Sequence, residues 1–347
     1  MAEEGPQGRQ GRGLGRARPQ LDAGGGPRPL RSRRRRVSAK GEPVEVVAVV
    51  GATATGKSAL ALDLAQSLGG EVVNADSMQL YRGMDVGTAK LAPQERRGVP
   101  HHLLDVLDVT DESTLAAYQT RARSAIEDIR SRGALPVLAG GSGLYVRAAL
   151  DHLEIPPTDP EVRARLEARS AAGEDDALRA ELRRVDPQAA EAIQEQNVRR
   201  IIRALEVVEL TGRPFSATAP TKTYVRPSLV IGLRDDWDLL TTRIEQRVLR
   251  MWAEGMLDET RRLETAGLRR GRTASRAIGY AQALAELAGE LTTAEAVAST
   301  QAATRRYARR QESWLRPDPR VVWLDASAPD LLGRAHEVVA RGDLSRA

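Results

Sequence analysis

The sequence predicts an α/β fold, in which a P-loop NTPase-like parallel sheet is flanked by helices and carries a helical insertion. Three observations predict it. The stretch GATATGKS, residues 51–58, lies between an apolar β-branched run, 44–50, and a run with helical apolar spacing, 59–68. Further short apolar runs alternate with helical stretches along the chain. A charged segment, 156–197, has helical spacing and no strand candidate.

The charge of the chain is unevenly distributed. Among its 347 residues the net charge is +5, but residues 1–43 hold eleven basic and four acidic side chains, which gives +7 there and −2 elsewhere. These first residues are rich in glycine, arginine and proline, so we expect a disordered basic tail. An alternative is that translation starts near Val37. Nucleic acid would have to bind the folded part through a local basic patch.

Composition also excludes some classes of protein. The chain has no cysteine and therefore no disulfide or thiolate zinc site. It has no run of about eighteen apolar residues, so we expect no membrane span. We expect a cytoplasmic chain that acts as a monomer.

The first motif predicts a site for a di- or triphosphate. Its glycines let successive backbone N–H groups point at one anion, and the N-terminus of the following helix adds partial positive charge. Lys57 supplies a charge for the outer phosphate, and Ser58 a hydroxyl for Mg²⁺. The predicted binding residues are Gly51, Ala52, Thr53, Ala54, Thr55, Gly56, Lys57 and Ser58. The motif alone does not say whether the phosphate belongs to a nucleotide.

The next predicted strand, 71–75, ends at Asp76. Ligands of open α/β sheets lie beyond the carboxyl ends of strands, so Asp76 is expected beside the first loop. Its alternative role is a helix N-cap. The segment 80–90 has the composition of a ligand-binding loop. His101 and His102 do not predict a metal site, because adjacent residues of an extended chain point to opposite faces.

A second glycine-rich junction is expected at the same edge of the sheet. Residues 114–132 have helical apolar spacing and stop at Gly133, and residues 134–139 read as a buried strand. This strand opens into Gly140-Gly141-Ser142-Gly143.

After the insertion, residues 199–206 are expected to return to the core as a helix, with Arg199 and Arg203 on one face. Solvent or a phosphate would explain these arginines equally well. A strand, 229–233, and a helical stretch, 239–266, interrupted near Gly255, follow.

Arginines are dense in the last third of the chain. Arg243 and Arg247 lie near the start of the stretch 239–266, where cations are unfavourable unless an anion is near. Four arginines and a tyrosine occur within 304–311, which suits an RNA backbone and a stacked base. A last strand is expected at 321–324 and a C-terminal tail over 331–347.

The ordered motifs of residues 46–325 resemble those of the tRNA dimethylallyltransferase (tRNA isopentenyltransferase) family. The matching stretches are GATATGKS, DSMQLYRGMDVGTAK, HHLLDV, GGSGLY, DPEVRARLE, NVRRIIRALEV, RIEQRV, AIGYAQ and TRRYARRQESWLR. Two positions depart from the family: Ser142 stands where threonine is common, and Ala281 where a basic residue is usual.

The resemblance implies an enzyme that modifies RNA. It would transfer the dimethylallyl group of dimethylallyl diphosphate to N6 of the adenosine 3′-adjacent to the anticodon, with Asp76 as base. The loop, Lys57, Arg243 and Mg²⁺ on Ser58 would hold the diphosphate. The implied contacts to the tRNA anticodon stem-loop are Asp76, Ser77, Met78, Gln79, Ser142, Arg163, Arg199, Arg200, Ile201, Ile202, Arg203, Arg276, Gly279, Tyr280, Arg305 and Arg309. The insertion, 156–197, would clasp the stem-loop, and 198–330 would complete the core.

Two other functions are compatible with the P-loop itself. A small-molecule or nucleotide kinase would transfer the terminal phosphate of ATP and would not need the C-terminal arginines. An RNA-binding NTPase would need an apolar strand that ends in a Walker B acid, and no such strand can be placed securely in the sequence.

Overall fold

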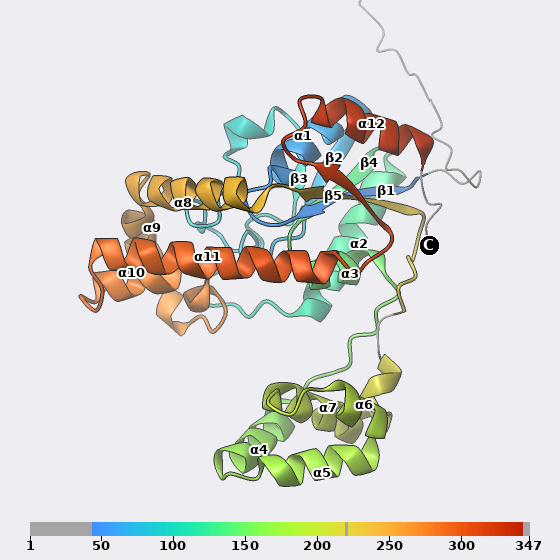
Figure 1. Cartoon of the computed structure of the whole chain (residues 1–347), viewed down its shortest axis with the longest axis vertical. Coiled ribbons are helices and arrows are strands. Elements are labelled where there is room, and N and C mark those ends of the chain that lie inside the picture. Colours follow the sequence, from blue (N-terminus) through green and yellow to red (C-terminus); the bar gives the residue numbers. More distant parts are fainter. Residues whose placement is uncertain (1–43, 219–220, 343–347) are drawn as a thin grey trace, which may run out of the picture. The chain divides into compact units, whose positions relative to one another are not determined.

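The computed structural model describes residues 44–218 and 221–342. The tail expected over residues 1–43 lies outside the described residues. Within them, six strands form one sheet with helices on both of its faces (Figure 1). The strands are β1 (Val46–Gly51), β2 (Gly70–Asn74), β3 (His101–His102), β4 (Leu135–Gly140), β5 (Ser228–Arg234) and β6 (Val321–Asp325).

The strand order is β3-β2-β4-β1-β5-β6, and every pairing is parallel. Strand β1 therefore lies between β4 and β5, with Val47 opposite both Val137 and Leu229. All carboxyl ends meet at one edge of the sheet, where ligands of such folds bind.

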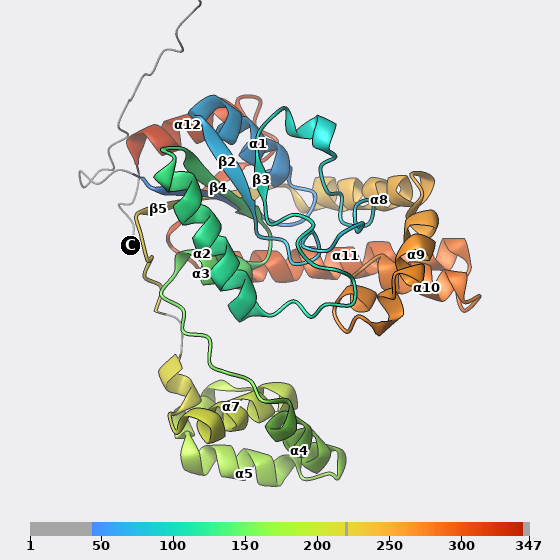
Figure 2. The same ribbon diagram turned by 180° about the vertical axis from the view of Figure 1, so that it is seen from behind.

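The two faces of the sheet have separate cores because strand side chains alternate in direction. On β1, Val46, Ala48 and Val50 belong to one core cluster and Val47 and Val49 to the other. Helices α2 (Leu115–Ser131) and α3 (Gly143–Leu150) cover the first face, and α1 (Lys57–Leu68) and α12 (Leu331–Arg341) the second (Figure 2).

The five predicted strands are confirmed, with small changes at their ends. Strand β3 was missed because two residues are too few for a periodic pattern. The helix expected over 114–132 is α2, whose N-cap Thr114 accepts a hydrogen bond from Ala117 N at 3.2 Å. The prediction of a C-terminal tail is wrong for residues 331–341, which form α12 and bury Ala335 and Val339.

The charged segment forms a helical module with its own core. It contains α4 (Pro160–Ala171), α5 (Asp175–Val185), α6 (Pro187–Ala192), α7 (Val198–Thr211) and the short 3₁₀ helix η2 (Phe215–Thr218). Leu178, Leu182 and Leu205 are among its buried residues. Helix α7 was expected to return to the α/β core, but its buried face packs in this cluster, so the module extends beyond residue 197. We call it the insertion module.

Apart from the short 3₁₀ helix η1 (Pro93–Arg96) between β2 and β3, the remaining helices follow β5. They are α8 (Trp237–Ala253), α9 (Met256–Thr265), η3 (Leu268–Arg270), η4 (Ala274–Arg276), α10 (Tyr280–Leu287) and α11 (Thr293–Leu315). The predicted break is confirmed at Gly255, whose φ of 99° separates α8 from α9. Helix α11 runs beside α8 and α10 (Figures 1 and 2). None of the described helices has the length and apolar character that crossing a membrane requires.

A core substitution in the insertion module should act locally. Leu178 is fully buried in the module, so Leu178→Ala should lower the free energy of unfolding by about 2–5 kcal/mol through lost packing and a cavity. We expect hydrogen exchange to quicken in α5 and α7 while β1 and β4 keep their protection. Leu64→Ala, in the core of the sheet, is the matched control and should give the opposite pattern. Equal loss of protection in β1 and α5 after Leu178→Ala would contradict an independent core.

Candidate active site at the carboxyl edge of the sheet

The loop between β1 and α1 has the form of a phosphate cradle. Gly56, the N-cap of α1, has a φ of 83°, which L side chains rarely adopt. Within the loop, Thr55 Oγ1 donates to the carbonyl oxygen of Ala52 at 2.8 Å, and Lys57 Nζ donates to the same oxygen at 3.3 Å. Lys57 and Ser58 line a polar cavity of about 70 Å³. An anion in this cavity would lie at the N-terminus of α1.

A second, larger cavity adjoins the first. It has a volume of about 270 Å³ and is lined in part by apolar side chains of α8 and of the segment after η4. Thr53, Asp76, Thr88 and Arg247 line both cavities. A charged ligand in the small cavity and a flatter, less polar ligand in the large one would therefore meet beside Asp76.

Asp76 follows β2, as predicted, and does not cap a helix. No helix begins after it, and its Oδ1 instead accepts a hydrogen bond from Met78 N at 2.9 Å. Its own N–H donates to Asn74 Oδ1, also at 2.9 Å. The N-cap alternative is therefore wrong, and the carboxylate is fixed in a tight turn at the junction of the two cavities.

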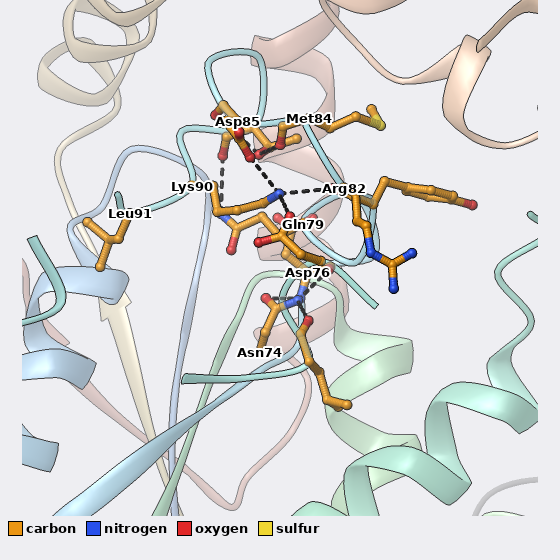
Figure 3. A network of polar contacts seen from close by, with 12 residues as sticks. Asn74, Asp76, Gln79, Arg82, Met84, Asp85, Lys90 and Leu91 are labelled. Atoms are coloured by element: carbon orange, nitrogen blue, oxygen red, sulfur yellow. Dashed lines mark hydrogen bonds and ion pairs between the residues drawn. The ribbon is translucent and has the colours of Figure 1, made fainter. Parts of the chain in front are cut away.

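The loop after Asp76 is held by a buried lysine (Figure 3). Lys90 is 9% exposed, and its Nζ donates to the carbonyl oxygen of Tyr81 and to carboxylates of Asp85 and Asp105, at 2.9, 2.7 and 2.6 Å. Lys90 is thus a structural residue of the loop expected to bind a ligand. Its three bonds satisfy the buried ammonium group.

Glu259 of α9 holds residues 85–87 of the same loop. Its carboxylate accepts hydrogen bonds from the backbone N–H groups of residues 85–87 and from the hydroxyl of Tyr280. The next carbonyl, that of Thr88, accepts from Gln79 Nε2 and Arg247 Nη2, both at 3.2 Å. The loop therefore orients an arginine at the site.

That arginine is Arg247, whereas Arg243, the arginine predicted for the site, lies outside both cavities in this structure. Arg247 lines both cavities and donates to Thr53 Oγ1 at 3.3 Å. Arg243 instead pairs with the carboxylate of Asp235 and lines neither cavity. Because α8 begins at Trp237, neither arginine lies in its first turn, so the helix dipole does not explain them.

Burial shifts the pKa values of the cations at the site. It lowers the pKa of Lys57 to about 8, although the nearby Asp76 carboxylate favours the charged form. Burial likewise lowers the pKa of Arg247, again against Asp76. Tyr307 of α11 lines the larger cavity. Burial raises the pKa of this tyrosine to about 12, with Asp76 adding to the shift. An anion in the small cavity would stabilise both cations.

The second glycine-rich junction lies at the same edge, as predicted. Ala139 and Gly140 line the small cavity. Ser142 is the N-cap of α3 and lines neither cavity, and its side chain accepts no capping hydrogen bond.

In the insertion module, several predicted RNA contacts have structural roles. Arg163 and Arg203 both pair with the fully buried Glu206, which also accepts from Asp159 N, and this pairing lowers the pKa of Glu206. Ile201 and Ile202 belong to the module core, which puts them out of reach of RNA. Arg199 and Arg200 are exposed.

The C-terminal residues divide in the same way. Arg276 is exposed and lines the larger cavity. Tyr307 and Arg310 also line this cavity. Gly279 and Tyr280 are buried, so Tyr280 is not available for base stacking. Arg305 pairs with Glu245, and the exposed Arg309 stacks 4.7 Å above the ring of Trp237.

Sequence reasoning considered both Arg243 and Arg247 but assigned the site role to Arg243, and it gave Thr88 no role of its own. The motif RIEQRV contains both Arg243 and Arg247. Their spacing places them on one helix face, so it does not show which of the two lies at the site. Asp235, just before α8, was the signal that one of them has a carboxylate partner.

Comparison with known proteins identifies similar chains. A family model described as IPP transferase matches residues 79–318. The tRNA dimethylallyltransferase of Thermobifida fusca is 59% identical over 299 residues, which cover 85% of this chain and 94% of that protein. The tRNA dimethylallyltransferase of Streptomyces avermitilis is 59% identical over 286 residues, covering 82% and 92%.

Two solved structures have the same fold. The tRNA isopentenylpyrophosphate transferase of Bacillus halodurans is 40% identical, with a TM-score of 0.63 over 85% of this chain and 94% of that chain. A eukaryotic dimethylallyltransferase acting on tRNA is 29% identical, with a TM-score of 0.74 over 85% and 78%.

The two arginines of α8 should differ in their effect on anion binding. Arg247→Met should weaken the binding of inorganic diphosphate about ten- to a hundredfold, because a charged hydrogen-bond donor leaves the cavity. Arg243→Met, the matched control, should change the dissociation constant by less than threefold. Titration calorimetry would measure both, and the reverse order would restore Arg243 to the site.

Diphosphate binding should weaken above pH 8. The pKa of Lys57 is about 8 without a ligand, so a growing fraction is neutral as the pH rises. Binding then requires the uptake of a proton, and affinity should fall up to about tenfold per pH unit. Calorimetry in buffers of different ionisation enthalpy would count the proton. Lys57→Met should bind weakly at every pH and lose this dependence; a wild-type profile that is flat to pH 9.5 would contradict the assignment.

Proposed function

The chain belongs to the IPP transferase family, and we propose that it transfers a dimethylallyl group from dimethylallyl diphosphate to N6 of the adenosine 3′-adjacent to the anticodon of tRNA. One observation carries the assignment to these residues. Asp76 lines both the polar cavity of the P-loop and the larger cavity, so a diphosphate bound in the first and an adenine bound in the second would meet beside its carboxylate.

The small cavity suits the diphosphate. Thr53, Lys57 and Ser58 of the P-loop line it together with Arg247, and the N-terminus of α1 adds partial positive charge. As the allylic C–O bond breaks, diphosphate leaves with the bonding electron pair. Fixed positive groups are effective there because they need no rearrangement as the negative charge grows.

The donor set fits Mg²⁺. The Ser58 hydroxyl lines the cavity beside Asp76, and among the described residues no cluster of three or more His, Cys, Asp or Glu side chains could hold a metal ion. Mg²⁺ commonly takes one or two protein oxygens together with substrate phosphates and waters. When bound to Ser58 and the diphosphate, it would neutralise charge on the leaving group.

The larger cavity suits the adenine. Its apolar lining includes Met78, Ile244 and Val248, and a base of the anticodon loop would enter it after turning out of its stack. N6 attacks the allylic carbon, and Asp76 accepts the proton that N6 loses as the C–N bond forms. Oδ1 of Asp76 is fixed by Met78 N, which sets the direction of the carboxylate.

Exposed arginines around the larger cavity supply the contacts to the RNA backbone. Arg276 and Arg310 line its wall, and Arg309 is exposed on the same helix as Arg310. This is the local basic patch that the charge distribution requires. In the insertion module, Arg199 and Arg200 are exposed and suited to the anticodon stem-loop, whereas Arg163 and Arg203 act through Glu206.

The activity is tested directly with purified protein, dimethylallyl diphosphate, Mg²⁺ and unmodified tRNA, followed by mass analysis of the nucleosides. We expect prenylated adenosine and released diphosphate. A parallel reaction with ATP tests the kinase alternative, which the comparisons do not support. Transfer of the terminal phosphate of ATP, without prenylated adenosine, would overturn the proposal.

Asp76→Asn should separate chemistry from binding. The amide oxygen can still accept from Met78 N, so the turn is kept, but the side chain no longer takes a proton. We expect kcat to fall about 10²- to 10⁴-fold, with the Kd for tRNA within twofold. Asp108→Asn, at an exposed carboxylate paired with Arg82, is the matched control and should leave both unchanged. Equal losses of turnover and tRNA affinity would assign Asp76 a structural role.

A further inference from the structure

A side chain of α11 reaches the backbone of the P-loop. Oε1 of Gln311 accepts a hydrogen bond from Thr53 N at 2.8 Å, across 258 residues of sequence. Gln311 is 4% exposed. The resemblance had placed it in an RNA-holding segment, but its amide points into the protein.

The other end of the amide lies against the second glycine-rich junction. A Cβ added at Gly141 would lie 2.1 Å from Gln311 Nε2 and 2.8 Å from the carbonyl oxygen of Gly51. Only glycine leaves room for the amide there. Gln311 is thus enclosed between the loop after β1 and the loop after β4.

The same helix also forms the wall of the larger cavity. Tyr307 and Arg310 lie within one turn before Gln311 and line that cavity, and Thr53 lines both cavities. One helix therefore touches the P-loop and the cavity proposed for the adenine.

From this geometry we propose that Gln311 is a positioning residue, which holds the P-loop in the form that receives the diphosphate. The inference rests on the proposed function, because it assigns the diphosphate to the small cavity. The bond fixes Thr53, whose hydroxyl accepts from Arg247, so the loop and the arginine are held in one arrangement. Without the amide, the partly buried N–H of Thr53 loses its partner and the loop can turn to satisfy it.

Two variants test the role. Gln311→Met keeps the volume of the side chain and removes the acceptor, and Gln311→Asn keeps an amide that is too short to reach Thr53. In each, we expect the Kd for inorganic diphosphate to rise about tenfold, as for one lost buried hydrogen bond. The KM for dimethylallyl diphosphate should rise with it, while the KM for tRNA stays within twofold.

A matched control lies on the same helix. Nε2 of Gln301 donates to the carbonyl oxygen of Glu245 at 3.3 Å, and Gln301 lines neither cavity. Gln301→Met should leave the Kd for diphosphate unchanged. A purely structural role for Gln311 would lower the yield of active protein, and hence the apparent kcat, with both KM values unchanged; that result would overturn the proposal.

The two proposals can fail separately. Calorimetry with inorganic diphosphate needs neither tRNA nor prenyl transfer. If wild-type protein prenylates tRNA but both Gln311 variants bind diphosphate as wild type does, positioning by Gln311 is wrong and the enzyme activity stands. If wild-type protein does not prenylate tRNA, the proposed function is wrong, and the binding data still decide whether Gln311 holds the loop.

Discussion

The loops of the site come together because the sheet is parallel and β1 is buried on both faces. The carboxyl ends of β1, β2 and β4 share one edge, which brings Thr53, Lys57 and Ser58 of the P-loop, Asp76 and Gly140 around one polar cavity. The alternating side chains of β1 enter two different cores, so a one-residue change of register would disturb both. The position of the P-loop is thereby fixed before any ligand is present.

Two cationic side chains of the site, Lys57 and Arg247, line the small cavity. Burial disfavours the ammonium of Lys57 and the guanidinium of Arg247, and the only opposing contribution common to both comes from Asp76. A diphosphate in the small cavity would relieve this cost, and its departure would restore it. The structural charges nearby are satisfied within the chain: Lys90 by Asp85 and Asp105, and Glu259 by backbone N–H groups and Tyr280. These bonds hold the loop in one arrangement beside the site, which favours preorganised catalysis.

Much of the fold could be predicted from local pattern, and the exceptions have physical reasons. Apolar runs identify β1, β4, β5 and β6, and the shorter run Val72–Val73 identifies β2, whereas β3 has two residues and is defined only by its pairing with β2. The amphipathic spacing of α7 shows that one face of the helix is buried, but it does not show in which core. The structure places that face in the core of the insertion module. At the site, the P-loop and Asp76 follow from strand ends. The choice between Arg243 and Arg247 depends on Asp235, which pairs with Arg243, and on the carbonyl of Thr88, which accepts from Arg247 across 159 residues of sequence and has no signal in the local pattern.

The insertion module is attached to the α/β core in a way that keeps its surface apart from the residues of the two cavities. The segments that lead into and out of it pair with each other, with Asp151 opposite Tyr224, and Arg320 bonds Asp151 and stacks on Tyr224. The module beyond this point has a complete core and supplies no residue to either cavity. Substitutions on its exposed arginine face therefore leave the reacting groups in place. Under the proposed function, preference among RNA partners could then evolve through the module without a change at the reacting groups, and the paired segments mark where a module could be exchanged.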